Sequence, residues 1–258
     1  MRIATWNVNS IRQRLDHVIG YLNSTAPDVL CLQELKCTDD AFPRLEIEAV
    51  GYHAQVHGQK GFNGVAILSK EPVEVVTGLP GDPDDVQARF IEARVGQGRD
   101  EVYVASIYLP NGNPVGTDKY PYKLGFMDRL IAHARMRLAE ERTLVLAGDY
   151  NVIPEPRDVD DPENWTNDAL FLPDTRERFR TLLSLGLTDA LRATTDEAGL
   201  YSFWDYQAGA WQRNRGIRID HLLLSPQAAD RLVDVAIDKH TRALDKPSDH
   251  VPVRIDLN

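Results

Sequence analysis

Acidic and amide side chains stand at the points where apolar segments of this sequence end. Asn7 ends ATWNV and Glu34 ends VLCLQE. Asp149 and Asn151 end LVLAGDYN. Carboxylate and amide oxygens suit a hard cation, and no Cys/His cluster has zinc spacing. Each residue alone is also compatible with a solvated strand end or a polar turn. Together they predict a site for Mg²⁺ or Mn²⁺, with the choice between the two left open.

Groups that handle protons or charge occur at further segments of the same kind. Tyr108 and Asn111 end ASIYLPN, Asp220 lies inside the apolar segment IRIDHLLL, and Asp249 with His250 precedes VPVRIDL. A buried Asp is rare without a partner. An Asp and a His beside metal-binding carboxylates fit hydrolysis of a phosphate ester. In that reaction a metal polarises the phosphoryl group, a carboxylate activates water and an imidazolium offsets the developing charge.

Other classes of chemistry are not indicated. The sequence contains no GxxxxGK[ST] segment for nucleotide phosphates and no GxSxG segment for a serine nucleophile. The 258 residues include 29 Lys and Arg against 39 Asp and Glu, so the net charge is 29 − 39 = −10 with neutral His. This balance argues against a general nucleic-acid coat, but it is compatible with an enzyme that gathers carboxylates around metal ions.

The composition is that of a globular chain, with 43% hydrophobic and 26% charged residues. No apolar run approaches the ~18 residues of a membrane span. No secretory signal precedes the first apolar strand. Cys31 and Cys37 cannot build a disulfide framework and favour a reducing compartment. We therefore expect one catalytic domain over residues 1–258, located in the cytoplasm.

Alternating strands and helices are expected to position the polar groups. The capping-box pattern from Ser10 to Gln13 predicts that a helix begins there, and a similar pattern from Asp174 to Glu177 predicts a second. An amphipathic helix is predicted over residues 124–138, and the proline-rich segment 154–173 predicts a loop. Segments 64–76 and 221–237 share the order strand, Ser, Pro-bearing turn, strand. Strands are predicted at residues 3–8, 28–33, 64–69, 73–77, 89–95, 101–108, 143–147, 217–224 and 251–257.

Motifs along nearly the whole chain resemble those of the exonuclease III family of abasic-site endonucleases, within the endonuclease/exonuclease/phosphatase superfamily. The matching segments are WNVNSIR (6–12), PDVLCLQELK (27–36), GVAILS (64–69), YLPNG (108–112), GDYNV (148–152), YSFWDY (201–206), NRGIRIDHLLLS (214–225) and KPSDHVPV (246–253). The resemblance implies an α/β (α+β) fold, a four-layer α/β/β/α sandwich of two mixed sheets flanked by helices. Ala190 and Leu191 depart from the family pattern, but neither replaces a residue of catalytic type.

The resemblance also implies which residues hold the metal and the phosphate. Glu34 would bind the catalytic metal, with Asn7 and Asp249 close to it. Tyr108 and Asn111 would contact the phosphate or stabilise the leaving oxygen. Whether one metal ion or two take part is left open by these motifs.

A second set of implied roles concerns the attack on phosphorus. Asp149, held by Asn151, would activate the attacking water. His250 would contact the scissile phosphate and would be oriented by Asp220. These four residues, together with Tyr108 and Asn111, form the predicted catalytic set.

Substrate recognition is expected from residues near the end of the chain. In the family, an apolar pocket receives the baseless sugar after its rotation out of the duplex. Trp211 is expected in a loop that contacts the duplex, next to positive charge from Arg213, Arg215 and Arg218. The residues expected to line the pocket are Phe203, Ile217 and Ile219.

The leading hypothesis is a monomeric, metal-dependent DNA repair nuclease. It would hydrolyse the phosphodiester 5′ to abasic sites in duplex DNA and remove 3′ blocking groups and 3′ nucleotides. The alternative is a superfamily phosphatase that acts on small phosphorylated molecules or lipids, which the NRGIRID and YSFWDY segments disfavour. A third hypothesis, a catalytically dead DNA-binding module, is disfavoured by the retained acids. The balance between endonuclease and 3′ exonuclease, and activity on RNA, are left open.

Overall fold

Two six-stranded mixed sheets form the centre of the computed structural model, which describes residues 1–258. The first sheet has the order β11-β12-β1-β2-β4-β3, and the second has the order β5-β6-β7-β8-β10-β9. β1 and β2 are parallel, as are β7 and β8, and the other pairs are antiparallel. The strands are β1 (Arg2–Asn7), β2 (Val29–Gln33), β3 (His53–His57), β4 (Val65–Ser69), β5 (Val75–Thr77), β6 (Phe90–Val95), β7 (Val102–Tyr108), β8 (Leu144–Asp149), β9 (Thr188–Asp189), β10 (Asp220–Leu224), β11 (Leu232–Ile237) and β12 (Val253–Leu257).

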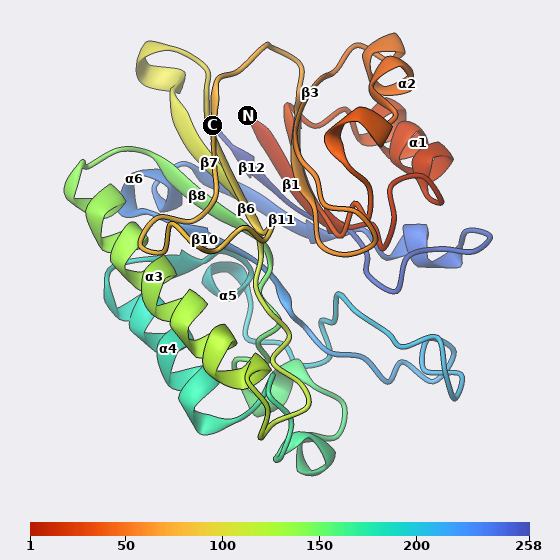
Figure 1. Cartoon of the computed structure of the whole chain (residues 1–258), viewed down its shortest axis with the longest axis vertical. Coiled ribbons are helices and arrows are strands. Elements are labelled where there is room, and N and C mark those ends of the chain that lie inside the picture. The colour runs from red at the N-terminus through yellow and green to blue at the C-terminus, as the bar shows by residue number, and fades with distance from the viewer.

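Helices cover the outer face of each sheet, so the four-layer sandwich expected from the sequence is confirmed (Figure 1). α1 and α2 lie beside the first sheet, and α3 and α4 lie against the second. The helices are α1 (Leu15–Thr25), α2 (Arg44–Ala49), α3 (Lys119–Ala139), α4 (Pro173–Ser184), α5 (Ala190–Thr194) and α6 (Pro226–Ala229). Short 3₁₀ turns are η1 (Asp39–Ala41), η2 (Gly98–Asp100), η3 (Pro156–Asp158), η4 (Pro162–Trp165) and η5 (Lys239–Ala243).

Three apolar layers hold the sandwich together. The layer between the sheets contains Ile3, Ile67 and Val104, whose strands expose alternate side chains to it. Phe126 of α3 belongs to the layer beneath the second sheet, and Trp6 belongs to the layer beneath α1 and α2. Because the central strands are apolar on both faces, each sheet is buried on both sides.

Two predicted helix starts are wrong, for identifiable reasons. Ser10 caps no helix, because residues 8–11 pair through their backbone with residues 33–35, and α1 begins only at Leu15. α4 begins at Pro173, whose ring presets a helical φ, so Asp174 lies in the first turn without capping it. The predicted loop over residues 154–173 contains only the short turns η3 and η4 before α4.

The predicted strands appear within a few residues of their expected bounds, but β3 and the two-residue β9 were not predicted. β3 is a short edge strand in which Ala54 is the only fully buried residue, so its alternation is weak. Segments 64–76 and 221–237, which share one order of elements in the sequence, also follow similar paths through the fold. β4 lies in the first sheet and β5 in the second, whereas β10 lies in the second and β11 in the first. Each segment therefore passes from one sheet to the other.

The strand register brings the polar strand ends to one rim of the sandwich. Asn7 pairs with Gln33, directly before Glu34, where the parallel strands β1 and β2 end. Asp149 pairs with Tyr108 on one side and Asp220 on the other. Gly148 is required in β8, since a Cβ there would lie 2.0 Å from the carbonyl oxygen of Ile107.

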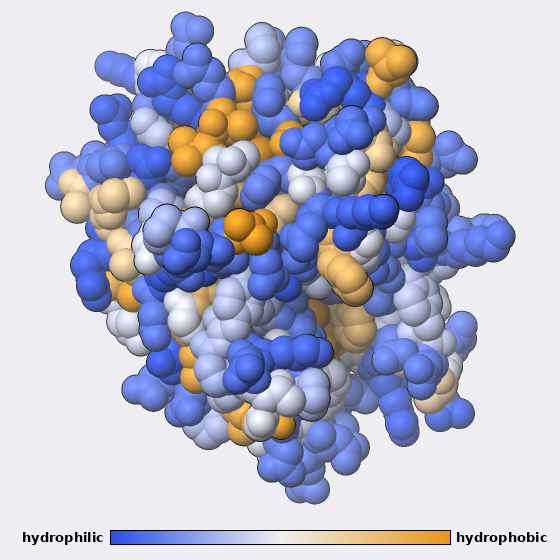
Figure 2. All heavy atoms as spheres, viewed as in Figure 1, coloured by the Kyte–Doolittle hydropathy of each residue, from blue (hydrophilic) through white to orange (hydrophobic).

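The visible outer surface is mostly hydrophilic, with hydrophobic side chains in small separate groups (Figure 2). None of the helices combines the length and the apolar character that crossing a bilayer requires.

Candidate active site

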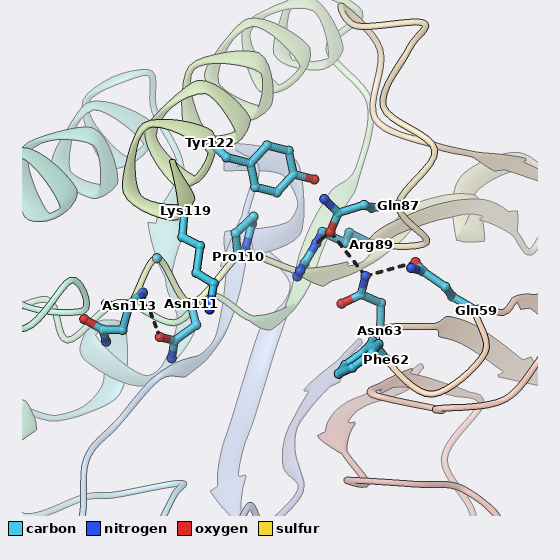
Figure 3. Close-up of a pocket in the computed structure, with 11 residues that line it drawn as sticks. Gln59, Phe62, Asn63, Gln87, Arg89, Pro110, Asn111, Asn113, Lys119 and Tyr122 are labelled. Atoms are coloured by element: carbon cyan, nitrogen blue, oxygen red, sulfur yellow. Dashed lines mark hydrogen bonds between the residues drawn. The ribbon is translucent and has the colours of Figure 1, made fainter. Parts of the chain in front are cut away.

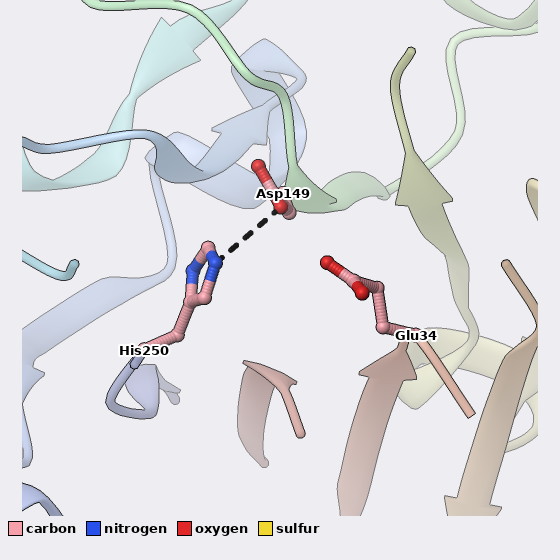
Figure 4. Close-up of side chains that lie close together, drawn as sticks. All are labelled: Glu34, Asp149 and His250. Atoms are coloured by element: carbon pink, nitrogen blue, oxygen red, sulfur yellow. Dashed lines mark ion pairs between the residues drawn. The ribbon is translucent and has the colours of Figure 1, made fainter. Parts of the chain in front are cut away.

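Glu34, Asp149 and His250 meet at the rim, although they come from three distant parts of the chain (Figure 4). One potential ligand atom from each lies within 4.8 Å of the others. Asn7 joins the two carboxylates, since its Nδ2 donates to Glu34 Oε1 and to Asp149 Oδ2, both at 2.9 Å. Asn7 and Asp149 are buried and Glu34 is half-buried. Both sheets therefore contribute to one acidic centre.

His250 is a buried cation between two acids. Its Nδ1 lies 2.8 Å from Asp220 Oδ2, and its Nε2 lies 3.7 Å from Asp149 Oδ2. Burial alone would lower the pKa of His250, but Asp220 and Asp149 outweigh it and raise the pKa to about 10. This pKa favours the imidazolium form at neutral pH, which can donate a hydrogen bond to a phosphate oxygen.

Asp220 is itself fixed by its neighbours. Ser202 Oγ donates to Asp220 Oδ2 at 2.6 Å, and the backbone N–H of Asp220 donates to the same hydroxyl at 3.2 Å. Its Oδ1 is buried without a partner. The carboxylate thus presents one oxygen to His250 in a fixed orientation.

Asp149, predicted to activate water, is buried and held by hydrogen bonds. The backbone N–H of Asn151 donates to Asp149 Oδ1 at 2.9 Å, and Asn111 Nδ2 donates to Asn151 Oδ1 at 3.1 Å. Burial raises the pKa of Asp149 and the charge of Asp220 adds to this, while His250 opposes it. A base with a raised pKa transfers protons more readily near neutral pH.

The donor set around Glu34 fits a hard divalent ion. Burial alone would raise the pKa of Glu34, but the hydrogen bond from Asn7 and the Lys36 ammonium at 2.9 Å lower it, so the group is a carboxylate. Asp249 lines a cavity at the rim together with Glu34 and Asp149, and it accepts a hydrogen bond from Asn9 at 3.1 Å. It is not part of the tight group of three. Carboxylate oxygens are the ligands that Mg²⁺ and Mn²⁺ prefer.

Tyr108 faces the carboxylates from the end of β7. Burial raises the pKa of its hydroxyl well above the usual value, and Glu34 and Asp149 raise it further. The phenol is therefore neutral and can donate a hydrogen bond at the site. Arg89 stacks over the ring, 4.9 Å from its centroid, and holds it in place.

An apolar wall adjoins the polar centre, within a cavity of about 230 Å³. Phe203 contacts the His250 ring edge-on, with centroids 5.0 Å apart, and pairs through its backbone with Ile217. Ile217 and Ile219 belong to a cluster with Leu170 and line the same cavity. The residues predicted to bind the sugar therefore lie together, beside the groups predicted to be catalytic.

Trp211 and two of the arginines lie outside this cavity. Trp211 packs edge-on against Trp204, with centroids 4.8 Å apart, and is partly exposed. Arg213 and Arg215 are exposed in the same turn and form no ion pair with the protein. Arg218 differs, because it is 2% exposed and binds Asp158 and Asp189. The expectation that Arg218 adds surface charge is wrong.

Several cavity residues were not predicted from the sequence. Trp165 and Asp168 line the wall from the proline-rich loop, and their residue types gave no signal there. A larger neighbouring cavity of about 420 Å³ shares Asn111 and Asn113 with the first (Figure 3). Arg89 and Lys119 also line it, with Gln59, Phe62, Asn63, Gln87, Pro110, Gly112 and Tyr122. A cationic cavity therefore continues the site on one side.

The fold and this rim define a class of metal-assisted phosphate-ester hydrolases. The chain belongs to the endonuclease/exonuclease/phosphatase family, whose model matches residues 4–250. This confirms the resemblance found in the sequence motifs.

Three relatives are similar to this chain over nearly their whole length. Exodeoxyribonuclease III of Haemophilus influenzae is 35% identical over 262 residues, covering 98% of this chain and 98% of that protein. An AP endonuclease from Archaeoglobus fulgidus is 39% identical, with a TM-score of 0.95 over 100% of this chain and 99% of that one. A 3′ phosphatase from Neisseria bound to a product DNA hairpin is 41% identical, with a TM-score of 0.96 and the same coverage.

Proposed function

We propose that the protein is a divalent-metal-dependent DNA repair nuclease of the exodeoxyribonuclease III type. It hydrolyses the phosphodiester 5′ to abasic sites in duplex DNA and removes 3′ blocking groups and 3′ nucleotides. The observation that carries the proposal is the convergence of Glu34, Asp149 and His250 beside an apolar wall formed by Phe203, Ile217 and Ile219. The site residues run from Asn7 to His250, so residues 1–258 act as one catalytic domain. Because no second copy is needed to complete the site, the proposed form is a monomer.

Each residue of the candidate site has its own role in the proposed hydrolysis. Asp149, aligned by Asn151, takes the proton from the attacking water. His250, held charged by Asp220, donates to a phosphate oxygen and offsets charge that develops in the transition state. Tyr108 and Asn111 contact the phosphate or the leaving oxygen. A Mg²⁺ or Mn²⁺ ion held by Glu34, with Asn7 and Asp249 nearby, supplies Lewis-acid polarisation of the phosphoryl group when bound.

DNA is favoured as the substrate by the surroundings of the centre. Phe203, Ile217 and Ile219 offer an apolar surface to a sugar that lacks its base. The exposed Arg213 and Arg215 offer cations to flanking phosphates, as do Arg89 and Lys119 in the neighbouring cavity. The name exodeoxyribonuclease III describes an enzyme that acts on DNA, and the 3′ phosphatase from Neisseria was solved bound to a product DNA hairpin.

One assay tests the proposal. A duplex with a single tetrahydrofuran abasic analogue is incubated with the protein and Mg²⁺ or Mn²⁺, beside a 3′-phosphorylated primer and an inositol phosphate. We expect a nick 5′ to the analogue and release of the 3′ phosphate, both abolished by EDTA, with no turnover of the inositol phosphate. Equal cleavage in EDTA would refute the metal role. Turnover of the inositol phosphate alone would support a superfamily phosphatase instead.

A further inference from the structure

A lysine is buried behind the active site without a carboxylate partner. Lys123 lies on α3 and is 0% exposed, on the face of the helix that carries Phe126, Met127 and Leu130. It lines neither of the two cavities at the rim. An ammonium group is expensive to remove from water, so its placement among apolar side chains calls for a compensating interaction.

Backbone carbonyl groups of two active-site segments accept hydrogen bonds from Lys123 and offset the cost of its burial. Lys123 Nζ donates to the carbonyl oxygen of Asn111 at 3.0 Å and to that of Asn151. Asn111 follows β7 and Asn151 follows β8, so one side chain links the ends of two parallel strands. Gly112 leaves room for this link, since a Cβ there would lie 2.7 Å from Lys123 Cδ.

The contact with Asn151 bears directly on the reacting groups. Asn151 has a φ of 48°, in the left-handed region that only a few residue types adopt without support. In that conformation its N–H donates to Asp149 Oδ1 at 2.9 Å, while its side chain donates to Leu109 O and accepts from Asn111. A bond to the Asn151 carbonyl therefore stabilises the conformation that aligns Asp149 with Asn111.

We propose that Lys123 is a positioning residue for phosphodiester hydrolysis, which holds the Asn111 and Asn151 segments in one geometry around the scissile phosphate. The proposal rests on the proposed function. Lys123 does not touch substrate and acts only through Asn111 and Asn151. Its loss should therefore slow the chemical step and leave the binding of duplex DNA nearly unchanged.

The test compares Lys123→Met with Arg135→Met, which removes an exposed charge from the same helix. On the abasic duplex, Lys123→Met is expected to lower kcat roughly 10–100-fold with KM within about threefold of wild type, because small misplacements of catalytic groups have effects of this size. Arg135→Met should match wild type. Lys123→Arg, which keeps both charge and donors, should recover most of the lost kcat.

A double variant separates positioning from general damage. Asn151→Ala keeps the backbone carbonyl that Lys123 binds but removes the side chain that this bond helps to align. Adding Lys123→Met to Asn151→Ala should therefore reduce kcat by a smaller factor than Lys123→Met does in the wild type. Should Lys123→Met unfold at the assay temperature, Lys123→Gln replaces it, with an intermediate kcat expected. Normal kcat, a change in KM alone, full additivity, or unfolding of both variants would overturn the proposal. Inactive wild-type protein would instead refute the proposed function.

Discussion

At the scale of single residues, neighbouring groups set the protonation states of two side chains of the candidate site. His250 is kept charged by Asp220 and Asp149, and Glu34 is kept ionised by Asn7 and Lys36. The same contacts fix orientation, since the ring of His250 is held through Nδ1 and leaves Nε2 toward Asp149. The charge states and the geometry therefore have a common cause.

The role of Asp149 predicts the effect of an isosteric change. Asp149→Asn removes the proton acceptor but keeps a polar group of similar volume, so the rate on abasic duplex should fall at least ~100-fold, within the 10²–10⁴-fold range of general-base catalysis. Fluorescence anisotropy should find DNA binding largely intact. Asp230→Asn, the same exchange at an exposed position, is the control. Near-normal turnover of Asp149→Asn would make the assignment wrong.

The pairing of Asp220 with His250 predicts a change in pH dependence. With the pKa of His250 raised to about 10, its charge is present at neutral pH and is lost as pH rises through that value. Asp220→Asn removes the largest cause of the increase, so the pKa of His250 should fall and its charge should be lost at lower pH. The ratio of wild-type to variant kcat/KM should therefore be larger at pH 8.5 than at pH 6. An equal ratio at both pH values would contradict this role for Asp220.

The raised pKa of His250 in the folded protein also makes the free energy of unfolding depend on pH. Because its pKa is raised above the unfolded value of about 6.5, its contribution to the free energy of unfolding is complete below that pH. The contribution declines as pH rises toward about 10. Asp220→Asn should therefore reduce the alkaline decline in Tm, which thermal unfolding at pH 6 and pH 9.5 would measure.

At the scale of elements, a buried ion network fixes the segment that carries the apolar wall. Arg218 Nε lies 2.7 Å from Asp158 Oδ1, and Arg218 Nη1 lies 2.8 Å from Asp189 Oδ2. Its backbone N–H also donates to Asp158 O at 2.8 Å. These bonds tie the start of β10 to η3 and to the N-cap of α5. Ile217 and Ile219, on either side of Arg218, take their positions from this network.

Removing Arg218 should therefore destabilise the fold strongly. Arg218→Met leaves two buried carboxylates without their main partner, and breaking a buried pair in this way costs about 3–5 kcal/mol. In a chain of this size we expect Tm to fall by roughly 6–20 °C. Arg94→Met removes an arginine whose side chain is 61% exposed and should change stability by less than ~0.5 kcal/mol. Thermal unfolding of both variants checks this; equal losses would contradict it.

Patterns along the sequence predict the strands and the rim residues, because both depend on local order. A polar residue that follows an apolar strand, such as Glu34 or Asp149, is visible in the sequence and lies at a sheet edge. Contacts made by long loops leave no such pattern, which is why Trp165 was not predicted. Lys123 was not predicted either, because the helix predicted over residues 124–138 begins one residue after it, whereas α3 begins at Lys119. The start of α1 depends on backbone pairing with residues 33–35, which no capping pattern reveals.

At the scale of the whole molecule, the site exists only when the two sheets are packed together. Asn7 and Glu34 come from the first sheet, whereas Tyr108, Asp149 and Asp220 come from the second. The apolar layer between the sheets sets their separation. A ligand that binds these groups together therefore binds only the folded state and must stabilise it.

This coupling predicts that Mg²⁺ or Mn²⁺ raises the thermal stability of the protein. At about 100 times its Kd, such an ion stabilises the folded state by about 2.7 kcal/mol. In a chain of this size that corresponds to a rise in Tm of roughly 5–10 °C. Differential scanning fluorimetry over a titration of each ion measures the shift.

A variant at Glu34 tests whether the metal-dependent rise in Tm comes from an ion bound at the rim. Glu34→Gln keeps the shape of the side chain but loses its charge, so the metal-dependent part of the rise should vanish, whereas Glu48→Gln on the exposed side of α2 should keep it. The comparison needs no DNA and no turnover, so it tests the ion site independently of catalysis. Asn7 and Lys36 keep Glu34 ionised, and this carboxylate is the proposed ligand of the ion. A rise in Tm that persists in Glu34→Gln would therefore mean that the ion binds elsewhere.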